Sequence, residues 1–275
     1  MHSVRQRLGF GTGLAIATML SFAAPAFAEL TNEELAKIAQ NPVGNLYNVP
    51  FQNNTNFNFG PEEKTQNVLN IQPVIPISIN KDWNVITRTI VPVISQPELA
   101  PNVSSQQGIG DTVFTAFLTP ATPGKWILAA GPVVQLPTHN SKELGNENWG
   151  MGPSFLAMHL DHGDPWVYGV LMNNVWSLSK DKGNDGSYND GLVQPFVNYN
   201  FKGGLYLKSA PELTVNWKAS SSDQWTVPLG GGVGKILHLG KLPVNSSIEA
   251  YYNVEKPEFG ADWTLRATMT LMFPK

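Results

Sequence analysis

The chain of 275 residues contains no cysteine, and its 18 basic and 21 acidic residues give a formal net charge of −3. We therefore expect no basic surface for nucleic acid and no disulfide framework. Charged residues make up 14% of the chain, against about 25% in soluble domains. After residue 28 no run of about 18 apolar residues is present, which excludes membrane-spanning helices. Such a composition suits a surface that is half lipid-facing and half wet.

Residues 1–28 have the three parts of a secretory signal peptide. Arg5 and Arg7 form the basic region, Leu14 to Phe22 is mostly apolar, and Ala26-Phe27-Ala28 is a small-x-small cleavage site. The short apolar stretch and the cleavage site disfavour the alternative of a membrane anchor. We predict export and cleavage near Ala28.

Residues 29–44 form a separate N-terminal segment on the periplasmic side. Thr31 followed by Glu34 predicts a capping box, and Asn41-Pro42 would end the short helix that follows it. Leu35, Ile38 and Ala39 would share one face of this helix. A simple leader and a plug for a pore both remain open as its role.

Residues 45–275 alternate apolar and polar side chains with the period of two that is typical of strands. We predict twelve strands, at about 45–54, 66–80, 83–96, 110–121, 124–137, 150–162, 165–179, 190–202, 204–217, 223–237, 243–255 and 261–273.

The links between these strands alternate in length. Tight links such as Lys81-Asp82 and Gly203-Gly204 alternate with longer ones at 55–65, 97–109 and 138–149. Bacterial outer-membrane barrels have short periplasmic turns, longer outer loops and an even number of strands. The fold class is therefore all-β, a transmembrane antiparallel barrel of about 12 strands with both termini in the periplasm.

Six prolines conflict with regular strands, because proline cannot donate to the ladder and a closed barrel has no edge to hold it. Bulges or local kinks could absorb them. They are Pro73, Pro76, Pro92, Pro132, Pro195 and Pro228.

The last strand is the strongest membrane signal. From Asp262 to Phe273 apolar residues alternate with polar ones, and aromatic rings lie at both ends, as in strands that cross a bilayer. Pro274 and Lys275 follow Phe273, so recognition of a terminal aromatic by the barrel-assembly machinery is less secure. The aromatics that we expect at the membrane interfaces are Trp83, Trp126, Trp217, Trp225, Trp263 and Phe273.

If the apolar positions face lipid, few ionisable residues face the lumen. A chain reversal between Pro257 and Glu258 would place Glu249 directly across the ladder from Arg266. Such charges could be a structural clamp or a constriction that selects solutes. The pore-lining candidates are Arg88, Asp111, Lys208, Glu212, Glu249 and Arg266.

Other motifs do not predict chemistry. The group His159, Asp161, His162 and Asp164 is better explained as a polar turn than as a metal site. The loop from Asp181 to Asp190 fails the EF-hand pattern, although calcium binding by an outer loop stays open.

Residues 230–235 lack the first glycine and the final Ser or Thr of a phosphate loop, and the glycines would instead allow curvature or contact with an inward group. No H-E-x-x-H or G-x-S-x-G motif occurs. We expect no catalytic residue, metal or cofactor.

Several segments resemble a family of Gram-negative outer-membrane barrels that is provisionally described as transporters of the MetA-pathway of phenol degradation, whose members often carry the name neuromedin U. The resemblance implies an outer-membrane barrel and, more weakly, a transported solute. The segments are Asn41–Asn58, Thr65–Pro97, Gly108–Pro120, Trp225–Lys235 and Tyr251–Lys275.

The sequence as a whole predicts an outer-membrane channel for passive uptake of small solutes. Twelve strands lie between a filled barrel and an open channel, so we expect a narrow pore. Ile86, Ile90, Phe117 and Phe196 on the luminal face would suit weakly apolar or aromatic solutes. A barrel plugged by its N-terminal segment and an outer-membrane lipase or protease are the alternatives. The expected partners are outer-membrane lipids, the barrel-assembly machinery and a small-molecule solute.

Overall fold

The computed structural model describes residues 30–99, 104–178 and 186–273. The signal peptide predicted at 1–28 and most of the candidate calcium loop lie outside these ranges. In the described part of the chain, no helix has the length and hydropathy needed to cross a membrane.

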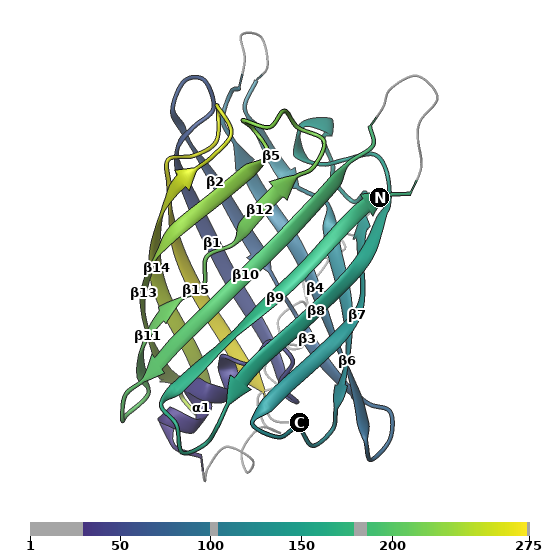
Figure 1. Ribbon diagram of the computed structural model, residues 1–275. Coiled ribbons are helices and arrows are strands. Elements are labelled where there is room, and N and C mark those ends of the chain that lie inside the picture. Colours follow the sequence, from purple (N-terminus) through teal and green to yellow (C-terminus); the bar gives the residue numbers. More distant parts are fainter. Residues whose placement is uncertain (1–29, 100–103, 179–185, 274–275) are drawn as a thin grey trace, which may run out of the picture.

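The strands form one closed antiparallel barrel (Figure 1). Each strand pairs with its neighbours along the chain, and the last strand pairs with the first over Tyr47↔Phe273 to Phe57↔Trp263. The segments are α1 Asn32–Ala39, β1 Tyr47–Phe59, β2 Lys64–Ile71, β3 Val74–Ser78, β4 Trp83–Gln96, β5 Gln106–Ile109, β6 Thr112–Pro120, β7 Trp126–Leu136, the 3-10 turn η2 Lys142–Leu144, β8 Gly150–Leu160, β9 Trp166–Ser177, β10 Asn189–Asn200, β11 Leu205–Ser209, β12 Leu213–Asn216, β13 Trp225–Leu239, β14 Leu242–Glu255 and β15 Trp263–Phe273.

The predicted twelve-strand barrel is confirmed, but three of the twelve strands are broken into two segments. These are β2 and β3, β5 and β6, and β11 and β12. The alternation of links also holds, with one difference: β1 continues to Phe59, so the link to β2 spans just 60–63 instead of the predicted 55–65. We call the end with the links 79–82, 121–125, 161–165, 201–204 and 240–241 the turn end, and the opposite end the loop end.

The strand breaks and one bulge accommodate most of the conflicting prolines. Pro73 lies in the break between β2 and β3, and Pro228 lies at the register shift between β13 and β14. Pro92 on β4 accepts from the amide of Gly110 in the break between β5 and β6. Pro195 on β10 lies opposite the break between β11 and β12. A broken strand leaves ladder positions where no donor is required, so proline costs little there.

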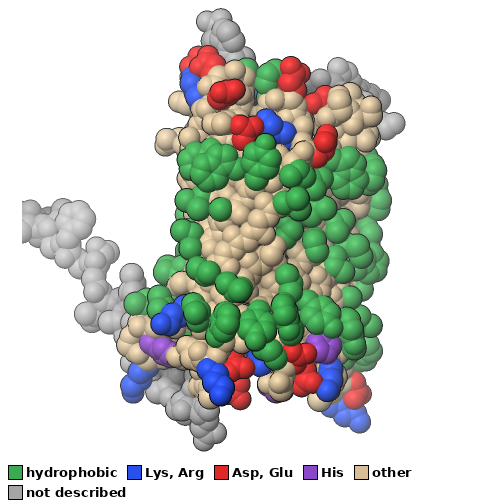
Figure 2. All heavy atoms as spheres, turned by 60° about the vertical axis from the view of Figure 1, so that its left-hand side comes forward, with side chains coloured by type: hydrophobic (Ala, Val, Ile, Leu, Met, Phe, Trp, Pro, Cys, Tyr) green, Lys and Arg blue, Asp and Glu red, His purple; other side chains and the backbone are tan. Residues whose placement is uncertain are grey.

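The barrel is apolar on its outer surface, and its interior holds buried polar and charged side chains beside an apolar cluster. Figure 2 shows hydrophobic side chains over the outer surface and charged side chains gathered at the two ends. Leu128, Leu207 and Ile248 are exposed on the outside, whereas Glu249 and Arg266 are buried inside. This inversion of a water-soluble fold is what a lipid-facing barrel requires.

The aromatic residues expected at the interfaces lie near the two ends of the strands. Trp83 and Trp126 begin strands at the turn end, where Phe273 ends β15; Trp217, Trp225 and Trp263 lie at the loop end. Trp126 packs edge-on against His159 and Tyr168, and Trp217 against Trp225. Three further tryptophans, Trp149, Trp166 and Trp176, are also exposed and extend these two groups.

Helix α1 lies inside the turn end of the barrel (Figure 1). The predicted capping box is present: the Thr31 hydroxyl accepts from the Glu34 amide at 3.2 Å, and the Glu34 carboxylate accepts from the Thr31 amide at 2.7 Å. Leu35 and Ala36 are buried against the inward side chains Tyr206, Ile236 and Met272. The apolar face of α1 therefore packs against the inner wall of the barrel.

Candidate functional site in the barrel interior

The lumen is divided lengthwise into a packed side and an open side. On the packed side, between β3 and β10, apolar side chains fill the interior as one cluster. Ile86, Phe117 and Met158 are at most 1% exposed there. Ile86 and Phe117 point into the lumen as predicted, but they are buried in this cluster, where Phe117 borders a cavity of only about 70 Å³.

The loop end of the packed side is covered by the link 137–149. Asp111, in the break between β5 and β6, accepts from His139 Nδ1 at 2.6 Å and from the Asn146 amide at 2.6 Å. Tyr188 donates to the Asn148 carbonyl at 3.1 Å from the next loop. Burial raises the pKa of the Tyr188 hydroxyl to about 12, so it stays a neutral donor. Two loops at the loop end are thus tied together over this part of the barrel mouth.

The open side holds two cavities separated by a polar network. The upper cavity has a volume of about 350 Å³ and lies at the loop end beside β12 to β15 and β1. The lower cavity, of about 130 Å³, lies between the network and α1, and Gln40 and Pro42, which follow the helix, line it. A passage through the lumen would therefore have to cross the network.

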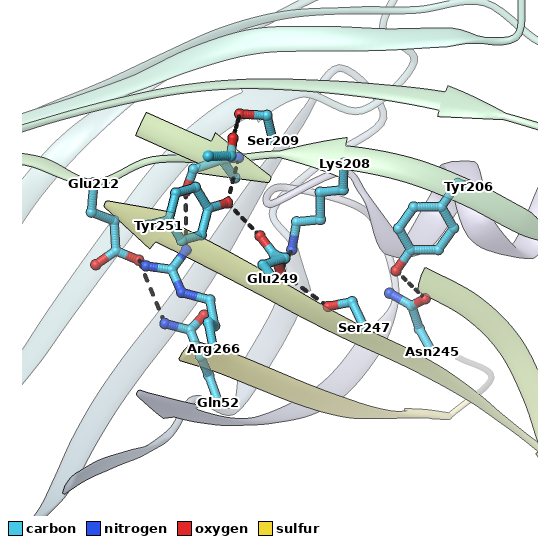
Figure 3. A network of polar contacts seen from close by, with 12 residues as sticks. Gln52, Tyr206, Lys208, Ser209, Glu212, Asn245, Ser247, Glu249, Tyr251 and Arg266 are labelled. Carbon is cyan, nitrogen blue, oxygen red and sulfur yellow. Dashed lines mark hydrogen bonds and ion pairs between the residues drawn. The ribbon is translucent and has the colours of Figure 1, made fainter. Parts of the chain in front are cut away.

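The network is built on Glu249 and Arg266, which lie opposite each other on β14 and β15 as the sequence predicts. The two side chains do not form an ion pair with each other. Glu249 Oε1 binds Lys208 Nζ at 2.9 Å, and Arg266 Nη2 binds Glu212 Oε1 at 2.9 Å (Figure 3). Lys208 and Glu212 both come from the strand formed by β11 and β12, on the far side of β13. Pairing in the ladder fixes the backbones of Glu249 and Arg266 but leaves their long side chains free to reach across the curved wall.

Glycines in β13 make this reach possible. Lys208, Gly232 and Glu249 occupy one line across β11, β13 and β14. Tyr206 likewise faces Gly234, where an added Cβ would lie 2.1 Å from the tyrosine ring. The hypothesis that this glycine run allows contact with an inward group is confirmed.

The strand break at Ala210 supplies the centre of the network. Its amide donates to Tyr251 Oη at 2.8 Å, and its carbonyl accepts from Arg266 Nη1 at 3.0 Å. Tyr251 in turn donates to Glu249 Oε2 at 2.6 Å, and the Arg266 guanidinium lies 5.0 Å from the centre of the Tyr251 ring. The network thus joins two ion pairs through one tyrosine and the backbone N–H and C=O of one residue, Ala210 (Figure 3).

Of the six predicted pore-lining residues, four meet in this network: Lys208, Glu212, Glu249 and Arg266. Arg88 lies beyond Glu212, beside a separate cavity of about 70 Å³, and donates to Gln72. Asp111 lies apart and holds the 137–149 loop. Four further residues bind in the network and were not predicted as pore-lining, although all occupy inward positions of the alternation: Tyr251, Gln52, Asn54 and Gln194.

The other groups considered in the sequence do not converge. Asp161 pairs with Lys125 at 2.6 Å, the His162 carbonyl accepts from Lys37, and Asp164 caps the amide of Trp166. Within the described ranges, no three metal-binding side chains come together. His139 and Asp111 are arranged as two members of a Ser–His–Asp triad would be. The hydroxyl of the nearby Ser141, however, is directed at Glu143 and Gln106 and not at His139.

The fold defines the class: the chain is a closed β-barrel of the outer-membrane type. No protein-family model matches it, and no curated protein matches its sequence. Among solved structures, the chain is similar to the COG4313 outer membrane channel from Pseudomonas putida F1, with a TM-score of 0.61 and 16% identity over 83% of this chain and 94% of that one.

Two other barrels match less well in shape. The outer membrane phospholipase A from Escherichia coli matches with a TM-score of 0.44 and 12% identity over 90% of this chain and 99% of that one. The β domain of the Bordetella autotransporter BrkA matches with a TM-score of 0.42 and 13% identity, over 83% and 100% of the two chains.

Proposed function

We propose that the chain is an outer-membrane channel for passive uptake of small solutes. It would reach the outer membrane after cleavage of a signal peptide near Ala28 and insertion by the barrel-assembly machinery. The observation that carries the proposal is the pair of cavities of about 350 and 130 Å³ on one side of the lumen, since a purely structural barrel of this size would fill both sides. The likeness of the fold to an outer membrane channel supports it.

The lining of the upper cavity favours polar solutes. Three asparagines and three threonines lie along it, whereas Ile86 and Phe117 are buried in the apolar cluster; Phe196, of the same cluster, lines the lower cavity. We therefore place polar solutes ahead of the weakly apolar or aromatic ones that the luminal Ile and Phe residues suggest. Liposome-swelling rates for sugars, amino acids and phenols would test this order.

The second candidate is a non-conducting barrel, because α1 fills the turn end. Gln40 and Asn200 exchange two amide hydrogen bonds of 2.8 and 3.0 Å, and Lys37 is 3% exposed between Glu33 and the His162 carbonyl. These contacts hold the plug on the turns 161–165 and 201–204.

Single-channel conductance in planar bilayers separates the two candidates. We expect small, discrete openings for the mature chain and a larger conductance after deletion of residues 29–44. Absence of any conductance in both forms would refute the channel, whereas conductance that appears after the deletion alone would identify α1 as a closed gate.

A further inference from the structure

The upper cavity has the form of a binding site as well as of a passage. Its volume of about 350 Å³ is near the lower end of the range for small-molecule pockets, about 300–1,000 Å³. Its floor is the Arg266–Glu212 pair with Tyr251, and its rim includes Pro257 and Gly260 of the loop between β14 and β15. A solute that enters from the loop end would therefore meet this network before it passes further into the lumen.

The charges at the floor cancel in pairs. Arg266 and Glu212, the charged residues that line the cavity, are 2.9 Å apart, and directly below them Lys208 and Glu249 form a second pair at the same distance. Arg88 lines the neighbouring cavity and not this one. A charged solute would find no unpaired counter-charge in the lining, so the lining favours an uncharged molecule.

Several hydrogen-bonding groups in the lining have no partner in the described part of the chain. Thr214 and Thr226 face each other on β12 and β13, and neither hydroxyl is bonded. Oε1 of Glu212 binds Arg266, Gln52 and Gln194, which leaves Oε2 of the same carboxylate without a partner. Asn253 uses its Nδ2 on the Ala261 carbonyl, so its Oδ1 is also open.

These groups are mixed donors and acceptors spread around one cavity. A hydroxyl group is both a donor and an acceptor, so a molecule with several hydroxyls can satisfy them together. Phe59 and the ring of Tyr251 add apolar surface for a carbon skeleton. We propose that this cavity binds a small uncharged polyhydroxylated solute, of the size of a monosaccharide or a short polyol. The proposal rests on the channel function and names its solute class.

The test uses the purified full barrel in detergent and in liposomes. Saturation-transfer NMR measures the binding of solutes, and liposome swelling measures their passage. Glucose and xylitol are the neutral probes. Gluconate is the anionic probe, glucosamine the cationic probe and phenol the aromatic probe. We expect the two neutral polyols to bind saturably and to compete with each other. Tighter binding of gluconate, glucosamine or phenol would overturn the proposal, and this comparison needs no variant.

Thr214→Val and Thr226→Val keep the side-chain shape and remove the unbonded hydroxyls. Each should weaken polyol binding about fivefold, as expected for one neutral hydrogen bond. Thr115→Val, beside the cavity of about 70 Å³, is the matched control and should leave binding unchanged. Equal binding by the native chain and the double variant would overturn the site. If solutes pass but no polyol binds saturably, the binding site is refuted and the channel function stands. If polyols bind but no solute passes, the binding site is supported and the channel function is refuted.

Discussion

Lys208 and Glu249 form an ion pair across an intervening strand, with Nζ and Oε1 2.9 Å apart. The residue between them in the ladder is Gly232, which has no side chain to block the contact. Lys208 is 21% exposed in its side chain and Glu249 is not exposed at all, so the carboxylate depends on this lysine, on Tyr251 and on Ser247. The pair ties β11 to β14 below the floor of the upper cavity.

Lys208→Met should destabilise the barrel strongly, because it leaves the buried carboxylate of Glu249 without its nearest cation. A broken buried pair costs about 3–5 kcal/mol, whereas removal of both charges is close to neutral. We therefore expect Lys208→Met combined with Glu249→Gln to recover most of the loss. Urea unfolding in phospholipid vesicles, followed by tryptophan fluorescence, measures the free energies; Lys241→Met in an exposed turn is the control. A double variant no more stable than Lys208→Met would contradict the prediction.

Gly232→Ala should be destabilising although it adds one methyl group. The added Cβ would lie 1.9 Å from the carbonyl oxygen of Ile248 and 2.6 Å from Cα of Glu249, and both are backbone atoms that cannot rotate away. Overpacking of this kind costs about 1–3 kcal/mol. Gly124→Ala, where nothing lies within 4 Å of the added atom, is the matched control. Equal unfolding midpoints for the two variants would contradict this prediction and would show that the backbone at β13 rearranges to accept the methyl group.

The strand pairs were open to prediction from the sequence because the period of two and the short links are local properties. The same locality gave the register of Glu249 with Arg266, since one chain reversal between Pro257 and Glu258 sets it. The ion pairs were not open to prediction in this way. They depend on side chains that cross a third strand, on the absence of a side chain at Gly232, and on the break that turns Ala210 inward.

The packed side of the lumen shows a second limit. Alternation assigns Ile86, Phe117 and Phe196 to the inside, and the structure agrees. It does not tell whether inward residues line a passage or fill the barrel, because that depends on how residues distant along the chain meet after closure. The fold of the 137–149 loop over the mouth, held by Asp111 and His139, is a tertiary contact of the same kind.

Leu35→Asp should release α1 from the turn end without disturbing the strands. Leu35 is 1% exposed among apolar side chains, so a carboxylate there would be desolvated without a partner. Lys37, now 3% exposed, should become a site of tryptic cleavage, and conductance should rise toward that of the chain without residues 29–44. Glu34→Gln keeps a capping side chain and should behave as the native chain does. Protection of Lys37 in Leu35→Asp would contradict docking by this face.

The rim of the upper cavity should loosen in acid. Hydrogen bonds from the Ser220 hydroxyl and the Glu258 amide hold the pKa of Asp223 below its ordinary value of 3.8, and bonds from Asn58 and Lys256 do the same for Asp262. Since both pKa values are lower in the folded loops, the stabilisation is complete above about pH 4 and is lost as the pH falls through the folded values. Hydrogen exchange of residues 256–262, divided by intrinsic rates, should rise in this window. The double variant Asp223→Asn, Asp262→Asn should remove the pH dependence of this exchange, and the control Glu147→Gln, in another loop, should leave it unchanged. Constant protection of these amides from pH 6 to about 2.5 in the native chain would contradict the role of both carboxylates.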